Sequence, residues 1–131
     1  MSIKILIVDD EPDFIETMVK RFTFRKMPVT AAKSGIEALT ILETEAFDVV
    51  IMDVRMPGKD GIETLKEIKK HHPLTEVIML TGHASVESGM RGMSLGAYDY
   101  VLKPVDFDEL LDKVRKAHER KQLNEGRRSA Q

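Results

Sequence analysis

The sequence predicts a doubly wound α/β domain with a parallel β-sheet. Short runs rich in Ile and Val alternate with segments whose apolar residues recur at helical spacing, and the pattern repeats as five strand–helix units. The length of 131 residues suits one globular unit, and five units are too few for a (β/α)8 barrel. Right-handed crossovers between parallel strands then place helices on both faces of the sheet.

The first unit begins with Ile3–Val8, an apolar run that predicts a strand buried on both faces. Pro12 suits the first position of the next helix, because the N–H that proline lacks has no helical partner there. That helix carries an apolar stripe of Phe14, Met18, Val19 and Phe22. In the second unit, residues 28–32 predict a weaker strand and residues 34–45 predict a helix. Its apolar positions are Ile36, Leu39 and Leu42.

Capping signals mark the start of three helices, because each has a capping residue followed three positions later by Glu. The pairs are Ser34 with Glu37, Asp60 with Glu63, and Asp106 with Glu109. The third strand is predicted over residues 48–52, and the segment 55–59 separates it from the helix that Asp60 begins. The apolar stripe of this third helix consists of Ile62, Leu65 and Ile68.

The helices of the last two units differ in the stability that the sequence predicts for them. Residues 76–80 and 98–102 predict the fourth and fifth strands. The helix between them, over residues 85–97, contains Gly89 and Gly92, and each interior glycine costs about 0.5–1 kcal/mol relative to alanine. We therefore expect it to be the least stable helix. Its apolar spacing is carried by Val86, Met90 and Met93, whereas the final helix is expected to bury Phe107, Leu110, Leu111, Val114 and Ala117.

Composition excludes several classes of function. With 20 basic and 22 acidic residues, the net charge of −2 does not favour binding to nucleic acid or to anionic membranes. The absence of cysteine excludes disulfides, thiolate metal sites and cysteine nucleophiles, which leaves carboxylates, hydroxyls, lysines and four histidines. No apolar run approaches about 18 residues and no signal peptide is evident, so we expect a soluble, cytoplasmic protein.

Polar side chains follow four of the five predicted strands at the point where each strand ends. Asp9 and Asp10 follow the first strand, Asp53 the third, Thr81 the fourth and Lys103 the fifth. Ligands of open parallel sheets bind beyond the carboxyl ends of the strands. If these four strands are neighbours, the side chains converge in one pocket.

The types of side chain at these strand ends suit phosphoryl transfer. Clustered carboxylates repel one another unless a cation intervenes, and hard oxygen ligands favour Mg²⁺. With a lysine and a hydroxyl beside them, one carboxylate can act as the nucleophile and form an aspartyl phosphate. Taken singly, Asp9 or Asp10 is equally suited to a helix cap or a turn. A phosphoryl-transfer site is favoured because suitable side chains follow four strands at once.

These residues lie in motifs that resemble the receiver domain of two-component response regulators. The motifs are ILIVDDEP at 5–12, VVIMDVRMPGKDG at 49–61, MLTGH at 79–83 and LGAYDYVLKP at 95–104, and the resemblance covers about residues 3–120. It implies a flavodoxin-like (β/α)5 fold with strand order 2-1-3-4-5. It also implies that the chain is a signalling phosphoacceptor with self-catalysed phosphotransfer and slow autodephosphorylation, not an enzyme with a separate substrate.

The resemblance assigns a role to each polar strand end. Asp53 is the implied phosphoacceptor, supplied by a sensor histidine kinase, a phosphotransfer domain or a small donor such as acetyl phosphate. The implied ligands of Mg²⁺ (or Mn²⁺) are Asp10, Asp53 and the backbone carbonyl of Arg55, with Asp9 acting through water. Lys103 pairs with the phosphoryl group in this scheme.

Further positions are implied to govern switching and phosphoryl lifetime. Thr81 is the switch hydroxyl, and Tyr100 is the aromatic residue whose rotamer follows it, although a half-buried strand aromatic explains Tyr100 equally simply. Arg55 and His83 stand at positions that tune the lifetime of the phosphoryl group. The bond before Pro104 is expected to be cis. Switching would alter the surface formed by the fourth helix, the fifth strand and the fifth helix, where a homodimer could form.

We expect the receiver domain to occupy residues 1–122. The basic, polar stretch 123–131 is either a solvated helix end or the start of a linker to an output domain, and we expect the last helix to break at Gly126. Because the receiver itself has balanced charge, no direct contact with nucleic acid or membrane is expected from it.

Two other classes of function remain open on the sequence alone. A Mg²⁺-dependent hydrolase that passes through an aspartyl phosphate usually has a second Asp two residues after the nucleophile as general acid, and Arg55 stands there instead. A flavodoxin-like binding module would have a Gly- or Ser/Thr-rich loop after the first strand to hold phosphate. This chain has three acids at positions 9–11, which would repel phosphate.

Overall fold

Five strands form one parallel sheet in the order β2-β1-β3-β4-β5, so the predicted fold class and strand order are confirmed. The computed structural model describes residues 2–56, 60–82 and 86–129. The strands are β1 (Ile5–Val8), β2 (Val29–Ala32), β3 (Val49–Asp53), β4 (Glu76–Thr81) and β5 (Asp99–Leu102). The three inner strands are buried on both faces because helices cover the sheet from either side, whereas the edge strand β2 is mostly half-buried.

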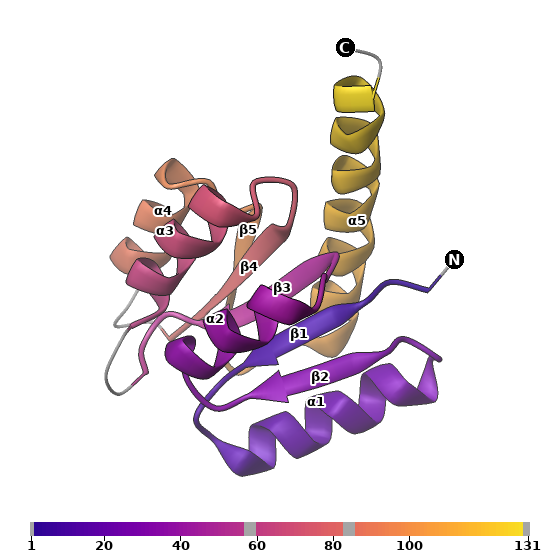
Figure 1. Ribbon diagram of the computed structural model, residues 1–131. Coiled ribbons are helices and arrows are strands. Elements are labelled where there is room, and N and C mark those ends of the chain that lie inside the picture. Colours follow the sequence, from indigo (N-terminus) through magenta and orange to yellow (C-terminus); the bar gives the residue numbers. More distant parts are fainter. Residues whose placement is uncertain (1, 57–59, 83–85, 130–131) are drawn as a thin grey trace.

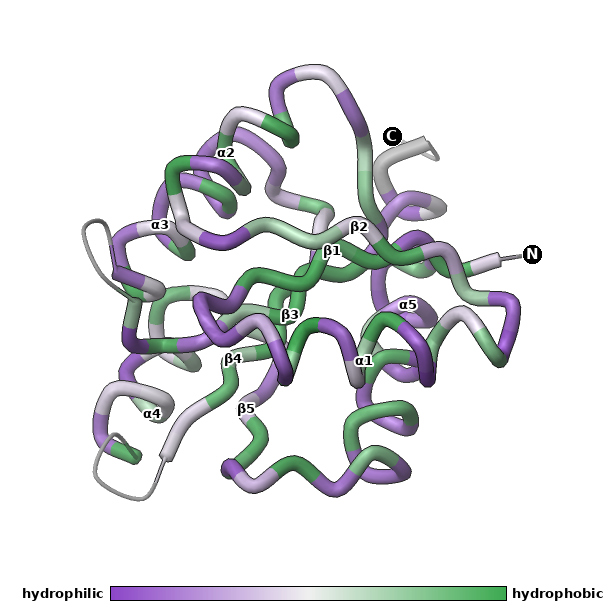
Figure 2. Tube along the Cα trace, turned by 90° about the horizontal axis from the view of Figure 1, so that it is seen from below, coloured by the Kyte–Doolittle hydropathy of each residue, from purple (hydrophilic) through white to green (hydrophobic). Residues whose placement is uncertain are grey.

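The helices form two layers around the sheet (Figure 1). They are α1 (Pro12–Phe24), α2 (Gly35–Thr44), α3 (Gly61–His71), α4 (Val86–Ser94) and α5 (Phe107–Ser129). Side chains of α1 and α5 pack in one hydrophobic cluster, and those of α2 and α3 pack in another on the opposite face of the sheet. Figure 2 shows the apolar residues concentrated in the strands between these layers. Among the described helices, none combines the length and the apolarity that crossing a membrane requires.

The predicted helix starts agree with the structure at Ser34, Asp60 and Asp106, whose side chain accepts the N–H groups of Asp108 and Glu109. The Ser34 hydroxyl accepts the Glu37 N–H at 3.1 Å, and the Asp60 carboxylate accepts the Glu63 N–H at 2.9 Å. The capping box at Ser34 differs in its second half, because the Glu37 side chain accepts the N–H of Lys33 instead of that of Ser34. Ile36 is 63% exposed, so the apolar contact of α2 with the sheet comes from the positions that follow it.

Helix α4 packs on the sheet through its glycines and not through the apolar residues that the sequence predicted to be buried. Met90 and Met93 are 58% and 41% exposed, whereas Gly89 and Gly92 are buried. A Cβ atom at Gly92 would lie 3.3 Å from Cγ of Met79 on β4. The two glycines therefore allow the helix backbone to approach the sheet closely, and their role is packing as well as the low helix propensity that the sequence indicates.

Amide hydrogens of α4 are expected to exchange faster than those of α5 in the unphosphorylated protein, because α4 is short and contains two glycines. Gly92→Ala is expected to slow exchange in α4 about fivefold, because alanine favours the helix and the three atoms nearest to the added methyl group belong to side chains, the closest being Cγ of Met79 at 3.3 Å. Hydrogen exchange followed by mass spectrometry measures both effects. Protection in α4 equal to that in α5 would contradict this expectation.

Helix α5 does not break at Gly126, in contrast to the sequence-based prediction, but continues to Ser129. The position of Gly126 is open, with no atom within 4 Å of a Cβ placed there, so an exposed helix can pass through it at a small cost. Two ion pairs at the amino ends of the strands hold this part of the helix. Arg120 pairs with the buried Glu76 of β4, and Lys121 pairs with Asp48 at 3.2 Å. Beyond these contacts α5 projects past the sheet (Figure 1).

Candidate functional site

The strand order brings the predicted site residues to one edge of the sheet. Strands β1 and β3 are neighbours, with Val8 opposite Met52, so Asp9 and Asp53 follow at adjacent strand ends. The backbone N–H of Asp9 still donates to Ala32 of β2 at 3.1 Å, which fixes the chain where it leaves the strand. Asp9 is fully buried and Asp53 is 9% exposed. Both carboxylates are therefore held in an environment with little access to water.

Four acidic side chains meet at this edge and form what we call the acidic cluster, which consists of Asp9, Asp10, Glu11 and Asp53. Each offers a carboxylate oxygen, and these oxygens lie within 4.8 Å of one another. One oxygen of Asp9 accepts the Glu11 N–H at 2.9 Å, and one oxygen of Asp53 accepts the Arg55 N–H at 3.0 Å. The turn after each strand thus orients the carboxylate and leaves its second oxygen for a cation.

The ammonium of Lys103 lies among three of these carboxylates. Its Nζ is 3.0 Å from Asp9, 2.9 Å from Asp53 and 3.2 Å from Glu11. Burial alone would lower the pKa of Lys103, but the hydrogen bonds and charges of Asp53 and Asp9 outweigh it and raise this pKa. For Asp9, burial raises the pKa, and the hydrogen bonds from Glu11 and Lys103 only partly oppose it. The site is a charged cluster in which one lysine compensates several acids.

The predicted switch residues lie beside this cluster, on β4 and β5. The backbone N–H of Lys103 donates to the carbonyl of Thr81 at 2.8 Å, which joins the ends of the two strands. The Thr81 side chain is buried, and its hydroxyl donates to the carbonyl of Gly82 at 3.2 Å. A Cβ at Gly89 would lie 3.1 Å from the Thr81 methyl group and 3.4 Å from the Tyr100 ring. Gly89 of α4 therefore packs against both residues, and Tyr100 is half-buried beneath the helix.

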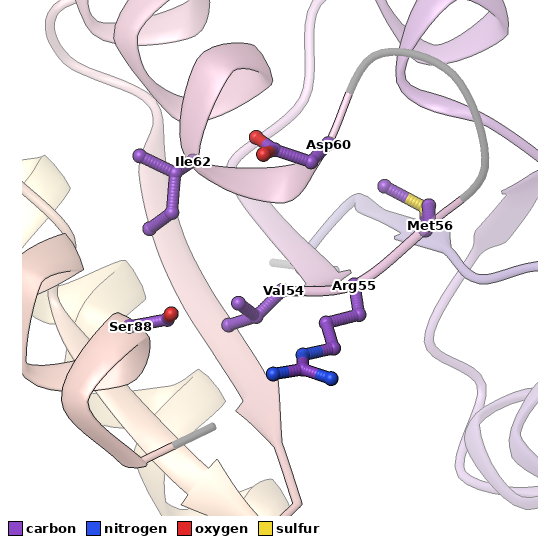
Figure 3. A pocket seen from close by; sticks show the side chains of 6 residues that line it. All are labelled: Val54, Arg55, Met56, Asp60, Ile62 and Ser88. Atoms are coloured by element: carbon purple, nitrogen blue, oxygen red, sulfur yellow. The ribbon is translucent and has the colours of Figure 1, made fainter. Parts of the chain in front are cut away.

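A pocket of about 460 Å³ lies next to the end of β3, between the segment that follows it and α4 (Figure 3). The side chains that line it are Val54, Arg55 and Met56 after β3, Asp60 and Ile62 at the start of α3, and Ser88 on α4. This space separates α4 from the segment that carries Arg55, whose side chain is exposed. His83, the other residue expected to tune phosphoryl lifetime, lies outside the described residues.

Three features of the site were not predicted from the sequence. The ring of Phe14 lies 4.8 Å from Nζ of Lys103, although its spacing indicated only a core position. Glu11 contacts the same ammonium. Gly61, at the start of α3, packs against the backbone of Asp53 so closely that a Cβ there would overlap the Asp53 carbonyl oxygen. A glycine directly after a capping Asp was the available signal for this last contact.

The Lys103–Pro104 bond is cis, the geometry that the resemblance implies.

Comparison with known families identifies the kind of domain that this chain forms. A model of the response regulator receiver domain matches residues 5–115. The chain belongs to this family. As a receiver of a two-component response regulator, it is a signalling domain, and neither the hydrolase nor the flavodoxin-like binding module is favoured.

The receiver is similar to part of several longer proteins and to isolated receiver domains. It is 42% identical over 107 residues to the regulatory protein AtoC of Escherichia coli, covering 82% of this chain and 23% of AtoC. It is 38% identical over 111 residues to the transcriptional regulator NtrC of Klebsiella pneumoniae, covering 85% of this chain and 24% of NtrC. The receiver thus spans about a quarter of the length of these curated relatives.

Solved structures show the same fold. A response regulator receiver domain from Clostridium thermocellum superposes with a TM-score of 0.87 at 36% identity, covering 92% of this chain and 98% of that one. NtrX from Brucella abortus superposes with a TM-score of 0.93 at 30% identity, covering 100% of this chain and 30% of NtrX. The receiver fold therefore extends over nearly all of this chain.

Proposed function

We propose that Asp53 is the phosphoacceptor of this receiver. The observation that carries the proposal is the ammonium of Lys103, which lies 2.9 Å from Asp53 and 3.0 Å from Asp9, the two buried members of the acidic cluster. A carboxylate oxygen of Asp53 attacks the phosphorus of a phosphohistidine on a partner kinase or phosphotransfer domain, or of acetyl phosphate. The bond from phosphorus to the imidazole nitrogen or acetate oxygen breaks, and that group leaves with the electron pair. Asp53 becomes an acyl phosphate, which water later hydrolyses slowly.

We further propose that Mg²⁺, or Mn²⁺, is bound by Asp10, Asp53 and the backbone carbonyl of Arg55, with Asp9 acting through water. The residues suit such an ion, because hard carboxylate oxygens from two strand ends lie within 4.8 Å of one another. When bound, the ion neutralises the clustered carboxylates and stabilises negative charge on the phosphoryl oxygens. Asp10 is exposed and so is accessible to an ion that retains several waters.

The proposed switch follows from the added charge. Phosphorylation replaces one negative charge on Asp53 with roughly two and adds acceptor oxygens. Lys103 pairs with one of these oxygens, and the Thr81 hydroxyl leaves the Gly82 carbonyl to donate to another. The Tyr100 ring then moves into the space that Thr81 leaves. Because Gly89 packs against both side chains, α4 shifts with them, and the surface formed by α4, β5 and α5 changes.

This surface is the proposed contact for a second copy of the receiver or for an output domain. Met90 and Met93 on α4 and Leu102 on β5 are exposed apolar residues there. Such side chains on a surface that changes with phosphorylation favour an association that depends on the phosphoryl group. We also propose that Arg55 and His83 set the lifetime of the phosphoryl group. Residues 123–131 are proposed to be either a solvated helix end or the start of a linker. We propose that the protein acts in the cytoplasm, where its kinase partner would present the phosphohistidine.

The phosphoacceptor is tested by incubation with acetyl phosphate and Mg²⁺ followed by intact-mass measurement. The wild type is expected to gain the mass of one phosphoryl group, and Asp53→Asn is expected to gain none, because an amide cannot form the acyl phosphate. Asp112→Asn, which changes an exposed acid on α5, serves as the matched control and is expected to react like the wild type. A metal-dependent adduct that persists in Asp53→Asn would overturn the assignment. Enzyme-like turnover of a small phosphate ester would favour the hydrolase instead.

Mg²⁺ is expected to stabilise the folded receiver, because the ion binds a cluster that exists only in the folded state. At a concentration about 100 times the Kd, the free energy of unfolding rises by about 2.7 kcal/mol. Asp10→Asn is expected to lose most of this effect and to fold normally, since Asp10 is exposed. Thermal unfolding with and without Mg²⁺ measures the shift, with Asp112→Asn again as the control. An equal shift in Asp10→Asn and the wild type would show that the ion binds elsewhere.

A further inference from the structure

The ring of Phe14 faces the ammonium of Lys103, with its centroid 4.8 Å from Nζ. Phe14 lies in the first turn of α1 and is half-buried, packed against the cluster formed by α1, α5 and the sheet. A cation at this distance from an aromatic ring is attracted to the negative face of the ring, and the attraction is stronger where water is excluded. Lys103 is itself largely buried, with 21% of its side chain exposed. The contact therefore lies in a partly desolvated environment, where the attraction is stronger than at an exposed site.

The ring differs in kind from the other partners of Lys103. Three carboxylates contact the ammonium, at 3.0 Å for Asp9, 2.9 Å for Asp53 and 3.2 Å for Glu11, and an ammonium has three hydrogens to donate. The ring attracts the same charge without accepting one of those hydrogens in a conventional hydrogen bond. It is also neutral, so neither metal binding nor phosphorylation alters its charge.

We propose that Phe14 is a positioning residue for phosphoryl transfer, whose ring holds the Lys103 ammonium at the reacting group while the carboxylate partners change. The inference rests on the proposed function of Asp53 and Lys103. Phosphorylation would change the chemistry of Asp53, and a bound metal ion would neutralise charge on Asp9, so two of the three carboxylate contacts of Lys103 would be altered. The contact with Phe14 persists through these steps and limits how far the flexible lysine can move.

The same ring fills part of the core, so the test must separate a cation contact from simple packing. Phe14→Leu retains an apolar side chain but removes the aromatic face, and Phe14→Tyr retains the face. Val19→Ala is the matched control, because Val19 is half-buried on the same helix and packs against the same cluster. Urea unfolding of each variant reports any loss of stability, and Phe14→Met provides a second non-aromatic variant if Phe14→Leu fails to fold.

Two readouts are combined. In NMR spectra of protein labelled with ¹³C-lysine, the Cε protons of Lys103 are expected to show an upfield ring-current shift that Phe14→Leu and Phe14→Met abolish and Phe14→Tyr preserves. The rate of phosphorylation by acetyl phosphate is expected to fall about fivefold in the two non-aromatic variants. In Phe14→Tyr and Val19→Ala it is expected to stay within about twofold of the wild type.

A folded Phe14→Leu or Phe14→Met variant that reacts at the wild-type rate overturns the proposal. So does a Phe14→Tyr variant that is slowed as much as Phe14→Leu, or a Val19→Ala variant slowed to the same extent, since the effect would then follow from packing. Failure of the wild type to accept a phosphoryl group would instead overturn the function proposed for Asp53, and the ring-current shift of Lys103 would still report whether the contact with Phe14 exists.

Discussion

Gly61→Ala is expected to destabilise the receiver by about 3 kcal/mol or more, a large effect for the addition of one methyl group. The new Cβ would overlap the carbonyl oxygen of Asp53 and lie 2.8 Å from Cα of Val54. Both atoms belong to the backbone and cannot turn away as a flexible side chain would. Relief requires α3 and the end of β3 to move apart, and movement of the β3 end shifts Asp53 within the acidic cluster.

The free energy of unfolding in urea measures this loss, and Gly126→Ala is the matched control. Gly126 also lies in a helix but has open space around it, so alanine there is expected to be neutral or to stabilise by up to about 1 kcal/mol. Phosphorylation of Gly61→Ala is expected to be slowed even at temperatures where the variant is folded. A Gly61→Ala variant within about 1 kcal/mol of the wild type would contradict the close contact between α3 and Asp53.

Lys103→Met is expected to cost about 3 kcal/mol of stability in the absence of metal and to slow phosphorylation about 100-fold. Methionine retains most of the apolar stem but leaves the buried Asp9 without its cation and Asp53 without a partner for its phosphoryl group. Mg²⁺ is expected to restore much of the stability, because it neutralises the same carboxylates, but not the rate. Restored stability without a restored rate would show that Lys103 has two separate roles, which are to neutralise the carboxylates and to position the phosphoryl group.

The stability loss in Lys103→Met is expected to depend on pH. Burial already raises the pKa of Asp9 above 3.8. Lys103→Met removes the hydrogen bond and the charge of Lys103, which both oppose this increase, and leaves only the hydrogen bond from the Glu11 N–H, so the pKa of Asp9 rises further. The folded variant then holds a proton that the unfolded chain has released, and its stability falls as the pH rises from about 4 toward neutrality. Lys113→Met is the control, since Lys113 has similar exposure and pairs with Asp99, which is more exposed than Asp9. A pH profile of Lys103→Met parallel to that of Lys113→Met would contradict this expectation.

The fold and the location of the site could be predicted because both depend on patterns along the chain. Runs of Ile and Val set the strands, and parallel strands place all their carboxyl ends at one edge, so Asp9, Asp53 and Lys103 had to follow strands at the same side of the sheet. The metal-binding and phosphoacceptor roles of these residues stay predictions, which the variants above test.

What could not be predicted depends on contacts between distant segments. The stripe of Met90 and Met93 indicated the buried face of α4, yet the space above Thr81 and Tyr100 admits only the backbone of Gly89. Phe14 was assigned to the core, since nothing in its spacing shows that a lysine 89 positions later would lie against its ring. The buried charge of Glu76 likewise depends on Arg120, 44 residues away.

The ion pair between Arg120 and Glu76 anchors α5 near its middle, so the two ends of the helix can tilt about this point. Its first turns pack against the sheet near β5, which carries the proposed switch residue Tyr100, and Arg120 holds its middle at the opposite end of the strands. Ser129 lies about 13 Å farther along the helix axis than Arg120. If the Phe107 end of α5 shifts in one direction, the Ser129 end therefore shifts in the opposite direction. A rearrangement around Asp53 would in this way displace the end of α5 on the far side of the domain.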